Sequence, residues 1–233
     1  MLRKHIPNAI TCLNLASGCI SIVLAFNGQY MNAAWFIALA AVFDFFDGFA
    51  ARLLKAYSPL GKELDSLADV VSFGVAPGMM IFCFISDLSE PANGSEYLAY
   101  LAFLIPVFSA LRLAKFNLDE RQTTSFIGLP VPANALFWAF GIGSSFNYLL
   151  DTISSPLLVV IAILIASWLL VSPISMFSLK FKHYKWVGNR LRYFFLASCL
   201  FLLIILGKSG ISACVLWYIL LSLFSNRALR KTA

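Results

Sequence analysis

Long apolar stretches recur along this chain, and polar residues gather in the short segments between them. Most stretches are close to 20 residues long, which is the length that a helix needs to cross about 30 Å of hydrocarbon at about 1.5 Å per residue. The pattern therefore predicts an all-α, polytopic membrane bundle of about eight transmembrane helices. Their expected ranges are 7–27, 31–53, 64–86, 96–116, 131–150, 154–172, 191–207 and 210–225.

Composition agrees with this pattern. Hydrophobic residues make up 61% of the 233 residues and charged residues 12%, about half the charged fraction of an ordinary soluble domain. The connections between spans are too short for a separate soluble domain, so residues 1–233 are expected to form a single membrane domain. The five cysteines lie inside apolar stretches without a C-x-x-C pair, which is typical of small buried hydrophobic residues.

The basic residues fall on one side of the predicted membrane. If the N-terminus is cytoplasmic, all 17 Lys and Arg residues except Lys208 lie in cytoplasmic segments. This is the positive-inside pattern, and it predicts an integral protein of the cytoplasmic membrane with both termini inside. The net charge of +6 therefore sets topology and attracts anionic lipids. No basic face with stacking aromatics lies outside the membrane loops, so nucleic acid is not expected as a partner.

Four carboxylates stand at the junction of the second and third apolar stretches, at the cytoplasmic side. Asp44 and Asp47 are three residues apart, and Asp65 and Asp69 are four apart, so each pair shares one face of a helix. The turn between the helices makes them antiparallel neighbours, so the four acids can converge. Each acid costs roughly 2.5–3.5 kcal/mol at the centre of a membrane helix. A divalent cation would cancel this charge, and ligation by oxygen alone favours Mg²⁺ or Mn²⁺, with room for two ions.

Two other interpretations of these acids stay open at this point. They could form structural ion pairs with Arg52, Lys55 and Lys62. They could also belong to a cation-coupled membrane transporter, because intramembrane acids commonly serve as ion or proton sites. A transporter would need a continuous polar path across the bilayer, and the outer halves of the second and third stretches show none.

The string D-x2-D-G-x2-A-R-x8-G-x3-D-x3-D favours a metal-dependent enzyme over structural ion pairs or a transporter. It resembles the signature of the CDP-alcohol phosphotransferase family at every fixed position: Asp44, Asp47, Gly48, Ala51, Arg52, Gly61, Asp65 and Asp69. The segments 6–18, 111–117 and 126–133 look like the integral-membrane members that act on CDP-diacylglycerol and serine. The resemblance runs over about 6–135, whereas 136–233 adds only further hydrophobic helices.

The resemblance implies an enzyme that transfers a phosphatidyl group from CDP-diacylglycerol to L-serine and releases CMP. It implies that Asp44, Asp47 and Asp65 bind the metal, and that Asp69 both faces the metal and acts as general base. It also implies contacts to the nucleotide and diphosphate, and a homodimer. The residues expected at the nucleotide and diphosphate are Asn8, Thr11, Gly48, Ala51, Arg52 and Gly61.

The acceptor side is less closely defined. Arg112, Lys115, Asn117 and Arg121 lie at the cytoplasmic end of the fourth stretch, where they could hold the serine carboxylate or a lipid phosphate, or serve only as positive-inside anchors. Sister enzymes of the family that use choline, inositol or glycerol 3-phosphate remain alternatives. Gly128, Pro130 and Pro132 predict a rigid elbow before the fifth stretch, which is either a simple helix start or a wall of the acceptor pocket.

Overall fold

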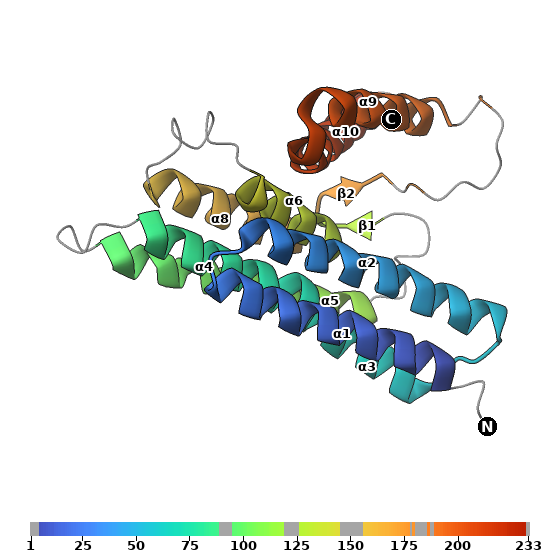
Figure 1. The fold of residues 1–233 in the computed structure, drawn as a ribbon. Helices are drawn as coiled ribbons and strands as arrows, with labels where there is room; N and C mark the ends of the chain where they lie inside the picture. The colour runs from blue at the N-terminus through green and yellow to red at the C-terminus, as the bar shows by residue number, and fades with distance from the viewer. Residues whose placement is uncertain are drawn as a thin grey trace.

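The computed structural model describes residues 5–88, 95–118, 126–144, 156–177, 179, 186 and 189–231. Within these ranges the protein is all-α apart from one pair of two-residue strands, as the sequence predicts. Figure 1 shows a bundle of long helices with a separate hairpin of two helices along one side. The helical elements are α1 (His5–Phe26), α2 (Tyr30–Leu53), α3 (Pro59–Asp69), η2 (Val70–Val75), α4 (Ala76–Leu88), η4 (Ser95–Phe103), α5 (Leu104–Leu118), α6 (Val131–Gly143), α8 (Pro156–Val171), α9 (Arg190–Leu206), η5 (Gly207–Ser209) and α10 (Gly210–Lys231).

Each of the eight predicted ranges is helical over most of its described residues, and the described exceptions are the end residues Asn27 and Ser172 and the residue after α6, Ser144. Five described segments are long and apolar enough to cross a membrane: His5–Phe26, Tyr30–Leu53, Pro59–Leu88, Tyr97–Leu118 and Arg190–Ser225. The last of these contains both α9 and α10, which fold back on each other around η5 (Figure 1). Helices α6 and α8 are apolar but shorter. The number of eight crossings thus stays a prediction, and 145–150, 154 and 155 lie outside the described residues.

The first helix has the polarity of a membrane helix. Its buried positions are small or polar: Pro7, Thr11, Asn14, Ser17, Gly18, Ser21 and Ala25. Several of its large apolar residues face outward, and Val23 and Phe26 are 59% and 61% exposed. Small residues allow helices to approach closely where lipid supplies no hydrophobic drive for association. A Cβ at Gly18 would lie only 2.7 Å from the Cα of Ser72, so α1 lies directly against η2.

The third apolar stretch contains a change of helical type. Helix α3 passes into the π-helical turn η2 and then into α4. The N–H of Ala76 donates to the carbonyl of Val71, five residues earlier. In a regular α-helix the ring of Pro77 would clash with the carbonyl of Phe73. The π-helical turn η2, which is wider than an α-helical turn, contains Phe73 and so lies at the position of this clash. Gly74 and Gly78 pack closely against Pro106 of α5, because a Cβ at Gly78 would lie 2.9 Å from Pro106 Cδ and one at Gly74 would lie 3.3 Å from Pro106 Cα.

The elbow before α6 is held by a short antiparallel pair. Strand β1 (Phe126–Ile127) pairs with β2 (Ser175–Met176), which follows α8. Gly128 N–H then donates to Ile174 O at 2.9 Å. Gly128 has φ +76°, and a Cβ there would lie 3.2 Å from the carbonyl carbon of Leu170, so both its conformation and its surroundings require glycine. Pro132 lies at the start of α6, confirming the expected helix start.

Candidate active site

The two pairs of acids lie on α2 and α3, as their spacing predicts. Asp44, Asp47 and Asp65 each place a carboxylate oxygen within 4.8 Å of the oxygens of the other two. Asp69 lies on the next turn of α3 and does not belong to this group of three, although it interacts electrostatically with all three acids. Four negative charges in a protein interior repel one another strongly. The arrangement therefore favours a bound cation.

Helix α1 supplies hydrogen-bond donors to the acids. Thr11 Oγ1 donates to Asp47 Oδ2 at 2.7 Å, and Asn14 Nδ2 donates to Asp69 Oδ1 at 3.3 Å. Ser72 Oγ in turn donates to the backbone carbonyl of Asn14 at 3.0 Å. All of these side chains are buried. The hydrogen bonds orient the carboxylates but leave their charge uncompensated.

No ion pair compensates the acids within the described part of the chain. Arg52 is exposed, and its Nε donates to the carbonyl of Gly48 on its own helix at 2.9 Å. The Oδ1 atom of Asp65 is buried without a hydrogen-bond partner. The interpretation of the acids as a structural ion-pair set therefore has no support here, and an unsatisfied carboxylate oxygen beside two further acids suits a hard cation.

A pocket of about 510 Å³ opens beside the acids, within the range of small-molecule sites. Its lining comes from α1, the end of α2, the α2–α3 turn and the first part of α3. The lining residues are Pro7, Asn8, Thr11, Asp47, Gly48, Ala51, Ala56, Tyr57, Ser58, Pro59, Gly61, Lys62 and Asp65. The pocket thus includes five of the six residues expected at the nucleotide; Arg52 is the exception. Lys62 and Tyr57 also line the pocket but were not predicted as site residues. The position of Lys62 directly after Gly61 of the family string could have indicated it.

The turn between α2 and α3 fixes the register of the second pair of acids. Ser58 caps α3, because its Oγ accepts from Gly61 N at 3.0 Å, and Pro59 occupies the first turn. Both features are favoured at helix N-termini. A Cβ at Gly61 would lie 3.0 Å from Asn8 Oδ1, so the absence of a side chain brings the turn against α1. Asp65 and Asp69 follow one and two turns later.

The four acceptor candidates fall in different places. Arg112 on α5 is only 7% exposed and interacts electrostatically with Asp69. Lys115 is exposed. Asn117 donates from Nδ2 to Ser66 Oγ at 2.8 Å, which ties the end of α5 to α3 between the two acids. Arg121 lies outside the described residues. Among the described acceptor candidates, Arg112 is therefore the buried cation that interacts electrostatically with one of the four acids.

The sequence comparisons agree with this geometry. Residues 4–172 match the sequence profile of a family described as CDP-alcohol phosphatidyltransferase. This chain belongs to that family. The four acids, the pocket and Arg112 all lie inside the matched range of this CDP-alcohol phosphatidyltransferase, whereas α9 and α10 lie beyond it.

Several named proteins are similar in sequence to this chain. A CDP-diacylglycerol–serine O-phosphatidyltransferase of Bacillus subtilis is 35% identical over 182 residues, which cover 78% of this chain and 92% of that protein. A protein of the same name from Helicobacter pylori is 36% identical over 132 residues, covering 56% of this chain and 54% of the relative. An archaetidylserine synthase of Methanothermobacter thermautotrophicus is 36% identical over 134 residues, again 56% and 54%. The chain thus spans nearly all of the first relative and about half of the other two.

Proposed function

We propose that this protein transfers the phosphatidyl group of CDP-diacylglycerol to the hydroxyl of L-serine, giving phosphatidylserine and CMP. The observation that carries the proposal is the group of three convergent carboxylates at the edge of a pocket of about 510 Å³, with a fourth acid one turn away. Family membership and the printed name of the Bacillus subtilis relative support the donor and the acceptor.

The three grouped acids, with Asp69 facing them, are proposed to hold divalent cations, two Mg²⁺ or Mn²⁺ ions per site. The residues fit such ions, because the donors are oxygens only and Asp65 Oδ1 is buried without a partner. Cations bound there would neutralise charge on the diphosphate of the donor. Thr11 keeps Asp47 oriented toward this position.

The pocket is proposed to receive the CDP part of the donor. Gly48 has no atom within 4 Å of the position where a Cβ would lie, so a ligand can approach the backbone of α2 there. Asn8, Thr11, Ala51 and Gly61 form the surrounding walls. Arg52 would leave its contact with the carbonyl of Gly48 to reach the diphosphate, since its guanidinium suits a phosphate geometrically.

The reaction needs a base for the serine hydroxyl, and Asp69 is suited to that role. It is 8% exposed, and Asn14 holds one of its oxygens. The hydroxyl oxygen of serine forms a bond to the phosphorus on the lipid side, and its proton passes to Asp69. The bond from that phosphorus to the bridging oxygen breaks, and CMP carries away the electron pair. A positioned base of this kind contributes about 10²–10⁴-fold to the rate.

The serine carboxylate is proposed to bind Arg112, with Lys115, Asn117 and Arg121 as further acceptor-side candidates. A charge-assisted contact to a guanidinium is worth roughly 1.5–3 kcal/mol. The Arg112→Ala variant is therefore expected to raise the serine KM about tenfold or more. Choline has no carboxylate to offer this arginine, whereas glycerol 3-phosphate and serine are anionic at one end, so the assay below compares acceptors directly.

The apolar helices and the distribution of basic residues support a location in the cytoplasmic membrane. We propose a single membrane domain over 1–233 with eight crossings, both termini and the acids on the cytoplasmic side, and assembly as a homodimer. The orientation rests on the distribution of the basic residues. The eight crossings rest on the coincidence of eight apolar ranges with helices.

One assay tests the proposed reaction. The purified protein in detergent is incubated with CDP-diacylglycerol, Mg²⁺ or Mn²⁺, and serine, choline, inositol or glycerol 3-phosphate in turn, and CMP is measured. We expect release with serine that EDTA abolishes and that falls about 10²–10⁴-fold in Asp69→Asn. Glu63→Gln, which alters an exposed acid on the same helix, serves as the control with unchanged activity.

The possible results separate the alternatives. CMP release with a different alcohol and none with serine would replace the acceptor while keeping the enzyme class. No release with any acceptor would contradict the enzyme and favour a cation-coupled transporter. Equal losses in Asp69→Asn and Glu63→Gln would remove the specific role of Asp69.

A further inference from the structure

Asn14 on α1 carries a buried amide of which only one end is hydrogen-bonded. The side chain is fully buried, and its Nδ2 donates to Asp69 Oδ1 at 3.3 Å. Its Oδ1 is buried and has no hydrogen-bond partner among the described residues. Since an ionised carboxylate only accepts hydrogen bonds, the amide nitrogen must face Asp69, and the oxygen is left as a free acceptor. A buried carbonyl oxygen without a donor is costly, which favours a ligand that brings a donor.

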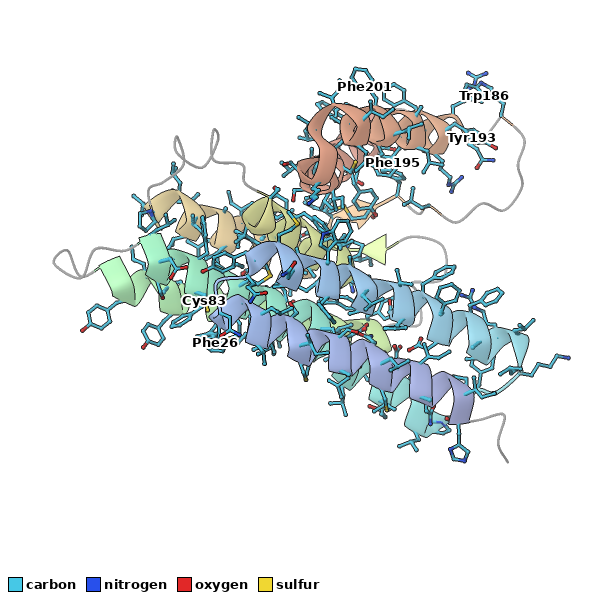
Figure 2. All side chains as sticks on the ribbon, viewed as in Figure 1. Phe26, Cys83, Trp186, Tyr193, Phe195 and Phe201 are labelled. Carbon is cyan, nitrogen blue, oxygen red and sulfur yellow. The ribbon has the colours of Figure 1, made fainter. Side chains whose placement is uncertain are left out.

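The direction of this amide is fixed by the packing of α1. Ser72 Oγ on η2 donates to the backbone carbonyl of Asn14 at 3.0 Å. One turn further along α1, a Cβ at Gly18 would lie 2.7 Å from Ser72 Cα. Figure 2 shows Phe26, at the far end of α1, in the region of Cys83 on α4, and α1 contacts α3, η2 and α4. The helix therefore runs alongside the third apolar stretch, and close contacts along its length prevent it from rotating.

The pair of Asn14 and Asp69 lies beyond the acids that line the pocket. Thr11, Asp47 and Asp65 belong to that lining. Asn14 and Asp69 lie about one turn further along α1 and α3, and the lining, as far as the structure describes it, includes neither. In phosphoryl transfer the attacking and leaving oxygens are roughly in line. With CMP leaving on the pocket side, the acceptor hydroxyl therefore approaches from the side of Asn14 and Asp69.

The free oxygen of Asn14 requires a donor other than the attacking hydroxyl, because the proton of that hydroxyl is proposed to pass to Asp69. Serine carries an ammonium group on the carbon next to the one that bears the hydroxyl, and an ammonium only donates hydrogen bonds. The two contacts are adjacent in the protein as well, because the amide that carries the free oxygen also contacts Asp69. The quaternary nitrogen of choline has no proton to donate, and inositol and glycerol 3-phosphate carry no ammonium.

We propose that Asn14 binds the acceptor, and that its Oδ1 accepts a hydrogen bond from the ammonium group of serine. Asn14 thereby places the neighbouring hydroxyl against Asp69 and selects an acceptor that carries a protonated amine. This assignment rests on the proposed function and adds to it the contact that distinguishes serine from the other alcohols considered above.

The test compares serine with 3-hydroxypropanoate, which keeps the hydroxyl and the carboxylate and lacks the amine. CMP release is measured with each acceptor at saturating CDP-diacylglycerol and Mn²⁺, and preference is the ratio of the two kcat/KM values. The wild-type protein should prefer serine by about tenfold or more, as expected for a hydrogen bond to a charged group. Asn14→Leu removes the amide and keeps a side chain of similar size. Both acceptors should then react more slowly, and the preference for serine should fall by about tenfold or more.

Further variants separate recognition of the amine from a purely structural role. Asn14→Asp keeps an acceptor oxygen at this position, so the preference for serine should be retained even where the rates fall. Thr11→Val is the matched control, because Thr11 also lies on α1 and donates to one of the acids. Its preference should equal that of wild type at saturating Mn²⁺. If Asn14→Leu does not fold, judged by its melting temperature in detergent, Asn14→Ala supplies the same removal.

The possible results distinguish this proposal from the alternatives. A wild-type preference smaller than about tenfold, an unchanged preference in Asn14→Leu, a lost preference in Asn14→Asp or an equal change in Thr11→Val would each overturn it. An unchanged preference together with a higher Mn²⁺ requirement in Asn14→Leu would assign the oxygen to a metal ion instead. If neither Asn14→Leu nor Asn14→Ala folds, the residue is structural and the proposal is wrong. Wild-type protein without serine-dependent CMP release would instead refute the proposed function.

Discussion

The hydrogen bond from Thr11 to Asp47 offers a direct test of the metal site. Thr11 Oγ1 lies 2.7 Å from Asp47 Oδ2, and the two residues are 3% and 6% exposed. The Thr11→Val change keeps the shape of the side chain and removes the hydroxyl. The carboxylate of Asp47 would then lose its donor on α1 while the packing between the helices is preserved.

The expected effect of Thr11→Val on metal binding follows from the negative charge of the Asp47 carboxylate. A hydrogen bond to a charged group contributes about 1.5–3 kcal/mol, and each 1.4 kcal/mol corresponds to about tenfold in an equilibrium constant. Removing a residue that orients a metal ligand typically lowers metal affinity about 10–100-fold. We therefore expect the Mn²⁺ concentration for half-maximal activity to rise by roughly that factor, with most of the maximal rate restored at saturating Mn²⁺.

The assay is a titration of CMP release with Mn²⁺ at saturating serine and CDP-diacylglycerol. A parallel titration follows the melting temperature, which rises with bound metal by mass action, so metal binding is also read without turnover. Thr11→Ser retains the hydroxyl and should behave like wild type. Ser17→Ala is the control on the same helix, because Ser17 donates to the backbone carbonyl of Leu13 rather than to an acid.

Two results would refute this reasoning. If Thr11→Val needs no more Mn²⁺ than wild type in either titration, the hydroxyl does not orient a metal ligand. If Thr11→Ser is impaired as strongly as Thr11→Val, the position acts through its shape, and the hydrogen bond to Asp47 has no separate role.

The remaining predictions concern two glycines and the orientation in the membrane. Gly18→Ala should lower the free energy of unfolding by about 1–3 kcal/mol, measured by denaturation in detergent, because its Cβ would lie 2.7 Å from Ser72 Cα; an unaltered stability would contradict the close packing. Gly48→Ala, with nothing within 4 Å of its Cβ, should preserve stability and raise the KM for CDP-diacylglycerol. A cysteine at Lys208 should react with an impermeant maleimide in intact cells and one at Lys62 only after permeabilisation; the reverse pattern would invert the proposed orientation.

The helices and the acids were predictable because their signals are local. Apolar runs of membrane length mark the spans, and the spacing of Asp44, Asp47, Asp65 and Asp69 places each pair on one helix face. The start of the third helix was predicted at 64, whereas α3 begins at Pro59. Its first turn is polar and is set by the Ser58 cap, so hydropathy alone does not detect it.

Contacts between distant helices were not predictable in the same way. Asn14 has no place in the sequence signature of the acids, yet it donates to Asp69, 55 positions further along the chain. Ser212 donates to the carbonyl of Phe137, 75 positions earlier in the chain, only because α10 folds back against the bundle. Such pairs depend on the rotation of each helix, which close packing sets at positions such as Gly18. The rotation of each helix about its own axis cannot be predicted from a single sequence that gives no information on long-range contacts.

The π-helical turn η2 has a consequence for how this protein can vary. A π turn inserts one extra residue, so the helix faces before and after it are offset by about 100° relative to an uninterrupted α-helix. Loss of one residue between Val70 and Val75 would regularise the helix and swing Asp65 and Asp69 away from α2, or else turn the Gly74 and Gly78 edge away from α5. The inserted residue thus allows one continuous helical segment to direct its acids toward α2 and its glycines toward α5 at the same time. The first orientation serves catalysis, and the second serves helix packing.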